Sequence, residues 1–225
     1  MHIRFTVNPG FVHIFSPSEF RIGLSFALFA CMLAAMHRRF LALLALPLVL
    51  SACGGGNAVA ECQDQYWDGA VGTCLPAGWT VVDRETLSQR GVGEEVVAAF
   101  QAEESVSGQF PTVLVTREVV ADDVTPDAYS KASIRSVSTL PGYKLVDSRA
   151  VTIDDADIEM HIFTAQPLSE EPERKFYQIS TVHSSAGFTF TALTPVSTSS
   201  ALEKEILLIL QSATLTQPEA GGASS

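Results

Sequence analysis

YKLVDSRAVTIDDADIEMHIFTAQ, at residues 143–166, decides the fold together with RKFYQISTVHSSAGFTFTALT, at residues 174–194. Each stretch holds two β-rich runs separated by a few turn residues, a pattern that is typical of a β-hairpin. The four predicted strands are 143–153, 157–166, 174–183 and 187–194. Consecutive hairpins favour an antiparallel sheet with helices packed on it over the parallel sheet of a βαβ fold.

Three further strands and one helix are predicted upstream of these hairpins. The β-rich runs that predict the strands are 79–83, 96–102 and 111–120. The helix covers about 126–138, and Thr125 is placed to accept a backbone N–H as its N-cap. Pro126 then occupies the first helical position, where its missing N–H costs nothing.

A last helix follows the hairpins, because apolar residues recur there at the spacing of one helical face. Leu202, Ile206 and Leu210 mark this face. The polar residues predicted to point away from it are Glu203, Lys204, Glu205 and Gln211. Ser200 and Glu203 fit a capping box, in which the two side chains bond the free N–H groups of the first turn. We therefore expect this helix to pack on the sheet through its apolar face.

Five short segments, taken in order, resemble the PsbP and Mog superfamily over roughly residues 75–215. They are Pro76-Ala77-Gly78-Trp79, Pro111-Thr112-Val113-Leu114-Val115, the helix with Tyr129, Tyr143-Lys144-Leu145-Val146, and Phe188-Thr189-Phe190-Thr191. The resemblance implies an α+β fold, an α/β/α sandwich around an antiparallel sheet. Members include bacterial lipoproteins of the DcrB and LpqN kind, and docking to partners rather than catalysis is what they share. The resemblance carries no site residue over to this chain.

MHRRFLALLALPLVLSAC, at residues 36–53, predicts export. A basic start is followed by about 11 apolar residues, too few to span a bilayer, which needs about 20. Leu50-Ser51-Ala52-Cys53 resembles the lipobox of bacterial lipoproteins, in which the cysteine is acylated and the chain is cut on its amino side. We expect a signal peptide at 36–52, a lipid at Cys53 and a domain held at the cell membrane or outer membrane, facing the periplasm or the exterior. The alternatives are an uncleaved anchor and a plain secretory signal.

The regions around the domain follow from this signal. Residues 1–35 contain a second apolar run, which indicates either that translation starts at Met36 or that the signal region is longer. Residues 53–74 are interpreted as a Gly-rich tether and a disulfide loop. The polar, Gly-rich residues 216–225 are expected to be a disordered tail.

The cysteines indicate one disulfide. Cys31 lies upstream of the predicted signal peptide and Cys53 is the lipid site, which leaves Cys62 and Cys74. An even pair in an exported domain favours a disulfide, and closing a loop of about 13 residues stabilises a fold by about 3 kcal/mol. A redox or metal role is the alternative, but the spacing is not C-x-x-C and no histidine lies nearby.

The charge of the chain argues against nucleic acid as a partner. Residues 1–52 hold four of the 14 basic residues and one of the 25 acidic ones, so residues 53–225 carry a net charge of −14. Nucleic-acid binding depends on Lys and Arg that neutralise phosphates. We expect no nucleic-acid partner.

Few residues are candidates for chemistry. Of the two histidines after Cys53, His161 is predicted on the outer face of its strand and His183 at a hairpin tip, so both are expected at the surface. Asp154, Asp155 and Asp157 could offer oxygen ligands to calcium, but they lack the spacing of a calcium loop. A hairpin turn explains these aspartates more simply, because Asp tolerates turn conformations. We assign no catalytic residue, no metal site and no cofactor.

These features favour a non-enzymatic lipoprotein whose domain binds another envelope protein. An envelope hydrolase with a convergent site is the second hypothesis, and convergent catalytic residues in a deep pocket would favour it. A small-molecule or lipid carrier is the third, and an apolar cavity between the sheet and the last helix would favour that.

Overall fold

A computed structural model describes residues 60–218 of the 225-residue chain. The predicted signal peptide, Cys31, Cys53 and residues 219–225 lie outside the described residues. Among the helices within 60–218, none is long and apolar enough to cross a membrane.

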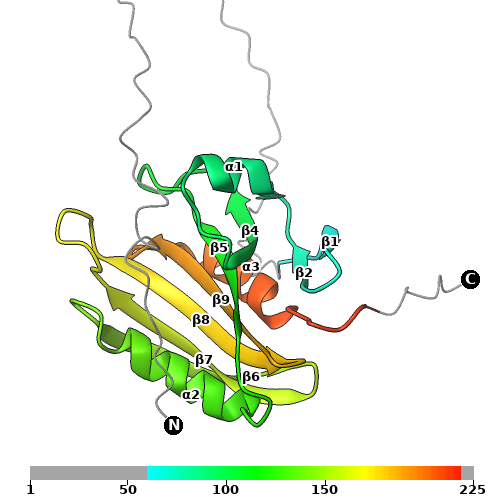
Figure 1. Cartoon of the computed structure of the whole chain (residues 1–225). Coiled ribbons are helices and arrows are strands. Elements are labelled where there is room, and N and C mark those ends of the chain that lie inside the picture. Colours follow the sequence, from blue (N-terminus) through cyan, green and yellow to red (C-terminus); the bar gives the residue numbers. More distant parts are fainter. Residues whose placement is uncertain (1–59, 219–225) are drawn as a thin grey trace, which may run out of the picture. The chain divides into compact units, whose positions relative to one another are not determined.

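The described part of the chain forms a seven-stranded antiparallel sheet, a two-stranded hairpin and three helices (Figure 1). In chain order these elements are β1 (Asp64–Trp67), β2 (Gly72–Leu75), β3 (Trp79–Val81), α1 (Arg84–Gln89), β4 (Val96–Ala102), β5 (Thr112–Val119), α2 (Pro126–Val137), β6 (Lys144–Ile153), β7 (Ala156–Ala165), β8 (Arg174–His183), β9 (Ala186–Pro195) and α3 (Ser200–Gln211). The strand order of the large sheet is β3-β4-β5-β9-β8-β7-β6. The seven strands predicted from the sequence are confirmed to within two residues at each end, whereas β1, β2 and α1 were not predicted.

Helix α3 closes one face of the sheet with an apolar contact. Ile206, Ile209 and Leu210 are all 0% exposed and belong to one core cluster with Tyr177 and Ile179 of β8. The alternation of β8 sends these two side chains towards α3. The layer in which a lipid carrier would hold its ligand is thus occupied by core side chains.

Helix α2 lies on the opposite face of the sheet, where it contacts β7 and β8, and this contact is more polar (Figure 1). Its buried residues are Tyr129, Ser130, Ala132 and Ser133. The Ser180 hydroxyl of β8 donates to the Ser133 hydroxyl at 2.9 Å. Gly187 of β9 lets the Tyr129 ring approach the sheet, because a Cβ at this position would come within 2.4 Å of the ring. Small residues and hydrogen bonds hold this part of the layer, and Val137 at the end of α2 packs against a second apolar cluster that contains Phe163 and Phe176.

The segment between the two paired cysteines is part of the fold. Cys62 and Cys74 are joined by a disulfide with their Cα atoms 5.4 Å apart, as the sequence predicts. β2 packs against α3, where the Thr73 hydroxyl donates to the Ile209 carbonyl at 2.6 Å. The Cys74 N–H donates to the Ser212 hydroxyl at 2.9 Å. The folded domain therefore begins before residue 75, where the sequence analysis placed its start.

The first turn of α3 differs from the sequence prediction. Ser199, and not Ser200, is the N-cap, and its hydroxyl accepts the Leu202 N–H at 3.2 Å. The capping box of Ser200 with Glu203 is therefore wrong, because the cap lies one residue earlier and Glu203 falls beyond the third helical position. By contrast, Thr125 caps α2 as predicted, accepting the Ala128 N–H at 3.3 Å.

We expect Ile206→Ala to lower the free energy of unfolding by about 2–5 kcal/mol, because it leaves a cavity in the layer between α3 and the sheet. Gln211→Ala, at an exposed position of the same helix, is the control and should change it by no more than about 0.5 kcal/mol. Urea unfolding followed by circular dichroism measures both. Equally mild effects would show that α3 does not depend on this contact.

Candidate functional site

Strand β6 is a long strand at an edge of the sheet. It is ten residues long and stands last in the strand order, and within residues 60–218 it pairs only with β7. The opposite edge, β3, has three residues. An edge strand exposes a row of backbone N–H and C=O groups that another chain can pair with. β6 is therefore the longer of the two edges of this sheet.

The turn at the end of β6 determines which backbone groups face outwards. Asp154 and Asp155 have φ values of 46° and 68°, which are those of a two-residue type I′ hairpin turn. In such a hairpin, the closing pair, Ile153 with Ala156, exchanges both backbone hydrogen bonds. Hydrogen-bonded and non-hydrogen-bonded pairs alternate along the two strands. The backbone N–H and C=O groups of Ser148, Ala150 and Thr152 therefore point away from β7.

A side-chain contact supports this assignment. The Ser148 N–H donates to Asp147 Oδ1 at 2.8 Å, so the carboxylate covers a backbone donor at the open edge. Asp147 is itself held by Arg149, whose Nε donates to Oδ2 at 2.7 Å. This hydrogen bond from Arg149 lowers the pKa of Asp147 below its usual range, which keeps the covering group ionised.

The turn aspartates serve the fold. Asp154 accepts the Thr214 hydroxyl at 2.6 Å and the Leu215 N–H at 2.5 Å, so it fastens the segment after α3 to the sheet. Within residues 60–218, no group of three or more His, Cys, Asp or Glu side chains is placed to hold a metal ion. The hairpin turn expected from the sequence accounts for these residues.

A β-bulge interrupts β6 near its start. Leu145 lies opposite Phe163 while Asp147 lies opposite Ile162, so Val146 is the additional residue. Leu145 is 57% exposed and Val146 is 52% exposed. The edge thus combines free backbone groups with two exposed apolar side chains.

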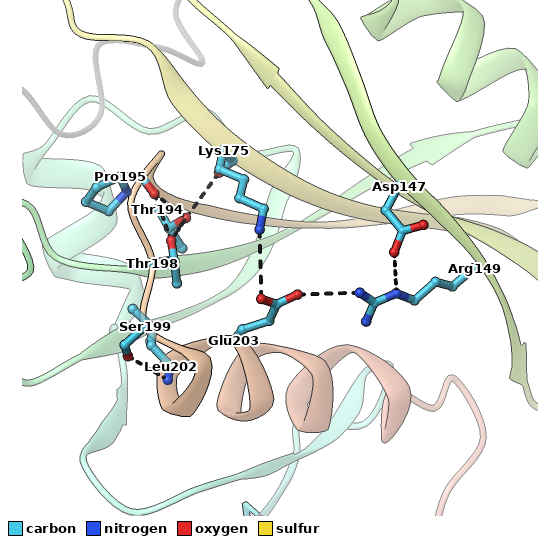
Figure 2. Close-up of polar contacts among 9 residues, drawn as sticks. All are labelled: Asp147, Arg149, Lys175, Thr194, Pro195, Thr198, Ser199, Leu202 and Glu203. Atoms are coloured by element: carbon cyan, nitrogen blue, oxygen red, sulfur yellow. Dashed lines mark hydrogen bonds and ion pairs between the residues drawn. The ribbon is translucent and has the colours of Figure 1, made fainter.

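A charged cluster connects β6 with α3 on one face of the sheet (Figure 2). Glu203 of α3 accepts the Arg149 guanidinium at 3.5 Å and lies 3.9 Å from Lys175 Nζ of β8. The prediction that Glu203 points away from the sheet is wrong, because it lies where α3 passes over these two cations. Glu205 was also predicted to point outwards, yet it accepts the Trp79 indole N–H at 3.0 Å. The charges that flank the apolar face of α3 hold this helix to the sheet.

His161 occupies the other face of the same strand pair. It is 3% exposed, so the prediction that it lies at the surface is wrong. His161 does lie on the predicted face of its strand. This face was expected to be exposed to water, but α2 covers it. The Tyr143 hydroxyl lies 2.7 Å from Nε2, and Nδ1 is 3.7 Å from Glu159, longer than a hydrogen bond. Burial lowers the pKa of His161, and the nearby Glu159 carboxylate opposes this shift.

Ser148, His161 and Glu159 lie together, and these are the residue types of a Ser-His-acid triad. Their connections do not match one, because the Ser148 hydroxyl donates to Glu159 at 2.5 Å while His161 Nε2 meets Tyr143. The histidine of such a triad is therefore not placed to take the proton of Ser148. The signal that sequence reasoning missed is the cross-strand pairing of Ser148 with His161. His183 is exposed beside the turn at Ser184 and Ser185, as predicted.

Comparisons with known proteins give the fold. No family model matches the chain, and no curated protein is similar to it in sequence. Its structure is similar to the crystal structure of LpqN, a protein involved in cell envelope biogenesis of Mycobacterium tuberculosis. The two share 12% sequence identity and a TM-score of 0.50, over 68% of this chain and 88% of LpqN. The likeness confirms an antiparallel sheet flanked by helices. What is shared is the fold.

Two further solved structures are similar at lower scores. Cyanobacterial PsbP (CyanoP) from Synechocystis sp. PCC 6803 shares 16% identity over 74% of this chain and 99% of its own, with a TM-score of 0.47. A variant of protein Mog1 shares 12% identity over 68% of this chain and 96% of its own, with a TM-score of 0.44.

The buried His161 should make stability depend on pH. Because its pKa is lowered in the folded state, the unfolded chain binds a proton as the pH falls through about 6.5, while the folded chain binds it only at lower pH. The free energy of unfolding should therefore fall between about pH 7.5 and 5.5, by as much as about 1 kcal/mol from this group. Urea unfolding at both pH values measures the loss.

Two variants assign this loss to one histidine. His161→Gln should reduce the difference between the two pH values, whereas His183→Gln, at the exposed hairpin tip, should keep it. If the difference persists unchanged in His161→Gln, other groups cause it and the account of His161 is wrong.

Proposed function

We propose that this protein is an exported lipoprotein, anchored through Cys53, whose domain docks to another protein of the cell envelope and catalyses no reaction. The open edge of β6, with exposed Leu145 and Val146 beside it, carries the docking function. A rigid sheet with a free edge is a surface to which other chains bind.

The anchor rests on the sequence Leu50-Ser51-Ala52-Cys53 and the short apolar segment before it. The similarity in fold to LpqN, a protein involved in cell envelope biogenesis, supports a role in the cell envelope. Six residues lie between Cys53 and Ala60, where the described chain begins, and the seven Cα–Cα steps from Cys53 to Ala60 span at most about 25 Å. An anchored domain would therefore work close to the lipid surface.

The alternatives receive less support. An envelope hydrolase needs a nucleophile beside its base, and here Ser148 bonds the acid while Tyr143 occupies His161 Nε2. A lipid carrier needs space between the sheet and α3, where Ile206 and Ile209 pack into the core. Docking requires only the backbone groups and the exposed apolar side chains at the β6 edge.

Replacing Cys53 tests the anchor. Cys53→Ser should abolish labelling with a fatty-acid analogue and leave an uncleaved precursor, because the acylated sulfur is required before the cut. Cys31→Ser is the matched control and should label like the unchanged protein. Continued labelling of Cys53→Ser would refute the anchor, and soluble, cleaved protein would indicate a plain secretory signal.

Crosslinking in native membranes tests docking. A photoreactive residue at Val146 should form adducts with another envelope protein, because this position lies beside the open edge. The same residue at Val81, 47% exposed on the opposite edge of the sheet, is the control and should form few. Mass spectrometry identifies the adducts. Equal yields at both positions would remove the support for docking at β6.

A further inference from the structure

We propose that the outer edge of β6 binds an extended, basic segment of a partner protein as an eighth strand of the sheet. This inference rests on the proposed docking function, and it adds the mode of binding and the chemistry of the partner.

The backbone of β6 is suited to strand addition. Ser148, Ala150 and Thr152 each direct an N–H and a C=O away from β7, as the two-residue turn at Asp154 and Asp155 requires. An added antiparallel strand would bond these groups in the same way that β7 bonds the groups on the inner side. The main-chain bonds supply affinity, and side chains beside the edge supply specificity.

Asp147 covers this edge in the absence of a partner. Its carboxylate accepts the Ser148 N–H at 2.8 Å and also the Arg149 Nε–H at 2.7 Å. A carbonyl of an incoming strand can replace it on Ser148 while Asp147 stays paired with Arg149. The Asp147 carboxylate can therefore leave the Ser148 N–H without becoming an unpaired charge, which keeps the free-energy cost of exposing the edge small.

The charges beside the edge select the partner. The carboxylates on β6, its turn and the adjacent strand are Asp147, Asp154, Asp155, Asp157 and Glu159, whereas Lys144 and Arg149 are the cations of β6. This excess of carboxylates favours a strand that carries Lys or Arg. A second copy of this chain would bring the same net negative charge to the contact, and like charges repel.

Two peptides test the proposal on the full-length protein in non-ionic detergent micelles. The regular part of β6 after the bulge runs from Asp147 to Ile153, so peptides of about seven residues match it. A peptide of alternating Lys and Val should bind at least about tenfold more tightly than one of alternating Glu and Val. Fluorescence anisotropy measures affinity, and hydrogen exchange should show protection at residues 148–152 and none at β3.

A proline substitution tests strand addition itself. Ala150→Pro removes an outward N–H without breaking a bond to β7, and proline is tolerated in edge strands on the solvent side. It should weaken binding of the basic peptide at least about tenfold, whereas Ala150→Ser should bind within about twofold of the unchanged protein. Thermal unfolding of both variants reports on the fold.

A second variant covers the case in which the proline disturbs the fold. Asp155→Asn keeps a residue type that tolerates positive φ while it removes one charge near the edge. It should weaken the basic peptide about two- to threefold and leave the acidic peptide no weaker.

Any of four results would overturn the proposal. They are absence of peptide binding, equal affinity for the two peptides, unchanged binding by Ala150→Pro, and protection of residues 148–152 that rises with protein concentration alone. The last result would assign the edge to a second copy of the chain. Val146 adducts without peptide binding would leave docking standing and reject only the strand addition. Failure of Cys53 labelling would not affect these measurements.

Discussion

The apolar contact between α3 and the sheet is the interaction on which the rest of the structure depends. Ile206, Ile209 and Leu210 have no other place to escape water, and their burial fixes which face of each strand points inwards. β2 and the disulfide then close this layer from the side through Thr73 and Ser212. The charges of Glu203 and Glu205 flank the apolar contact and bond to β6, β8 and Trp79.

The sequence predicted the strands and helices whose apolar residues recur with a regular period. It mispredicted the burial of residues that a distant element covers. The hairpins and the apolar face of α3 follow from alternation and helical spacing, which each segment carries alone. His161 was placed correctly in its strand but wrongly at the surface, because α2 covers that face of the sheet. β1 and β2 were missed, since strands of four residues leave almost no period to detect.

The same distinction applies to the candidate site. That β6 is an edge depends on the strand order, which pairs β5 with β9 and leaves β6 outermost. No local pattern in residues 144–153 indicates this position, and its length alone would suit a central strand. The carboxylate of Asp147 on the Ser148 N–H is likewise visible only in three dimensions. What the sequence did indicate is the acidic turn, although its role there was read as local geometry.

The bulge at Val146 has a consequence for assembly. The bulge shifts the pairing register of β6 by one residue. A ligand strand that pairs in register along Asp147–Ile153 would therefore be out of register at Leu145. A regular edge can pair with an added strand, which in turn exposes an edge for the next strand. Fibrils grow by this repeated addition. A phase break in the template limits the length of any matched repeat. The bulge that leaves Val146 exposed therefore limits the strand that can pair with β6 in register to a short one.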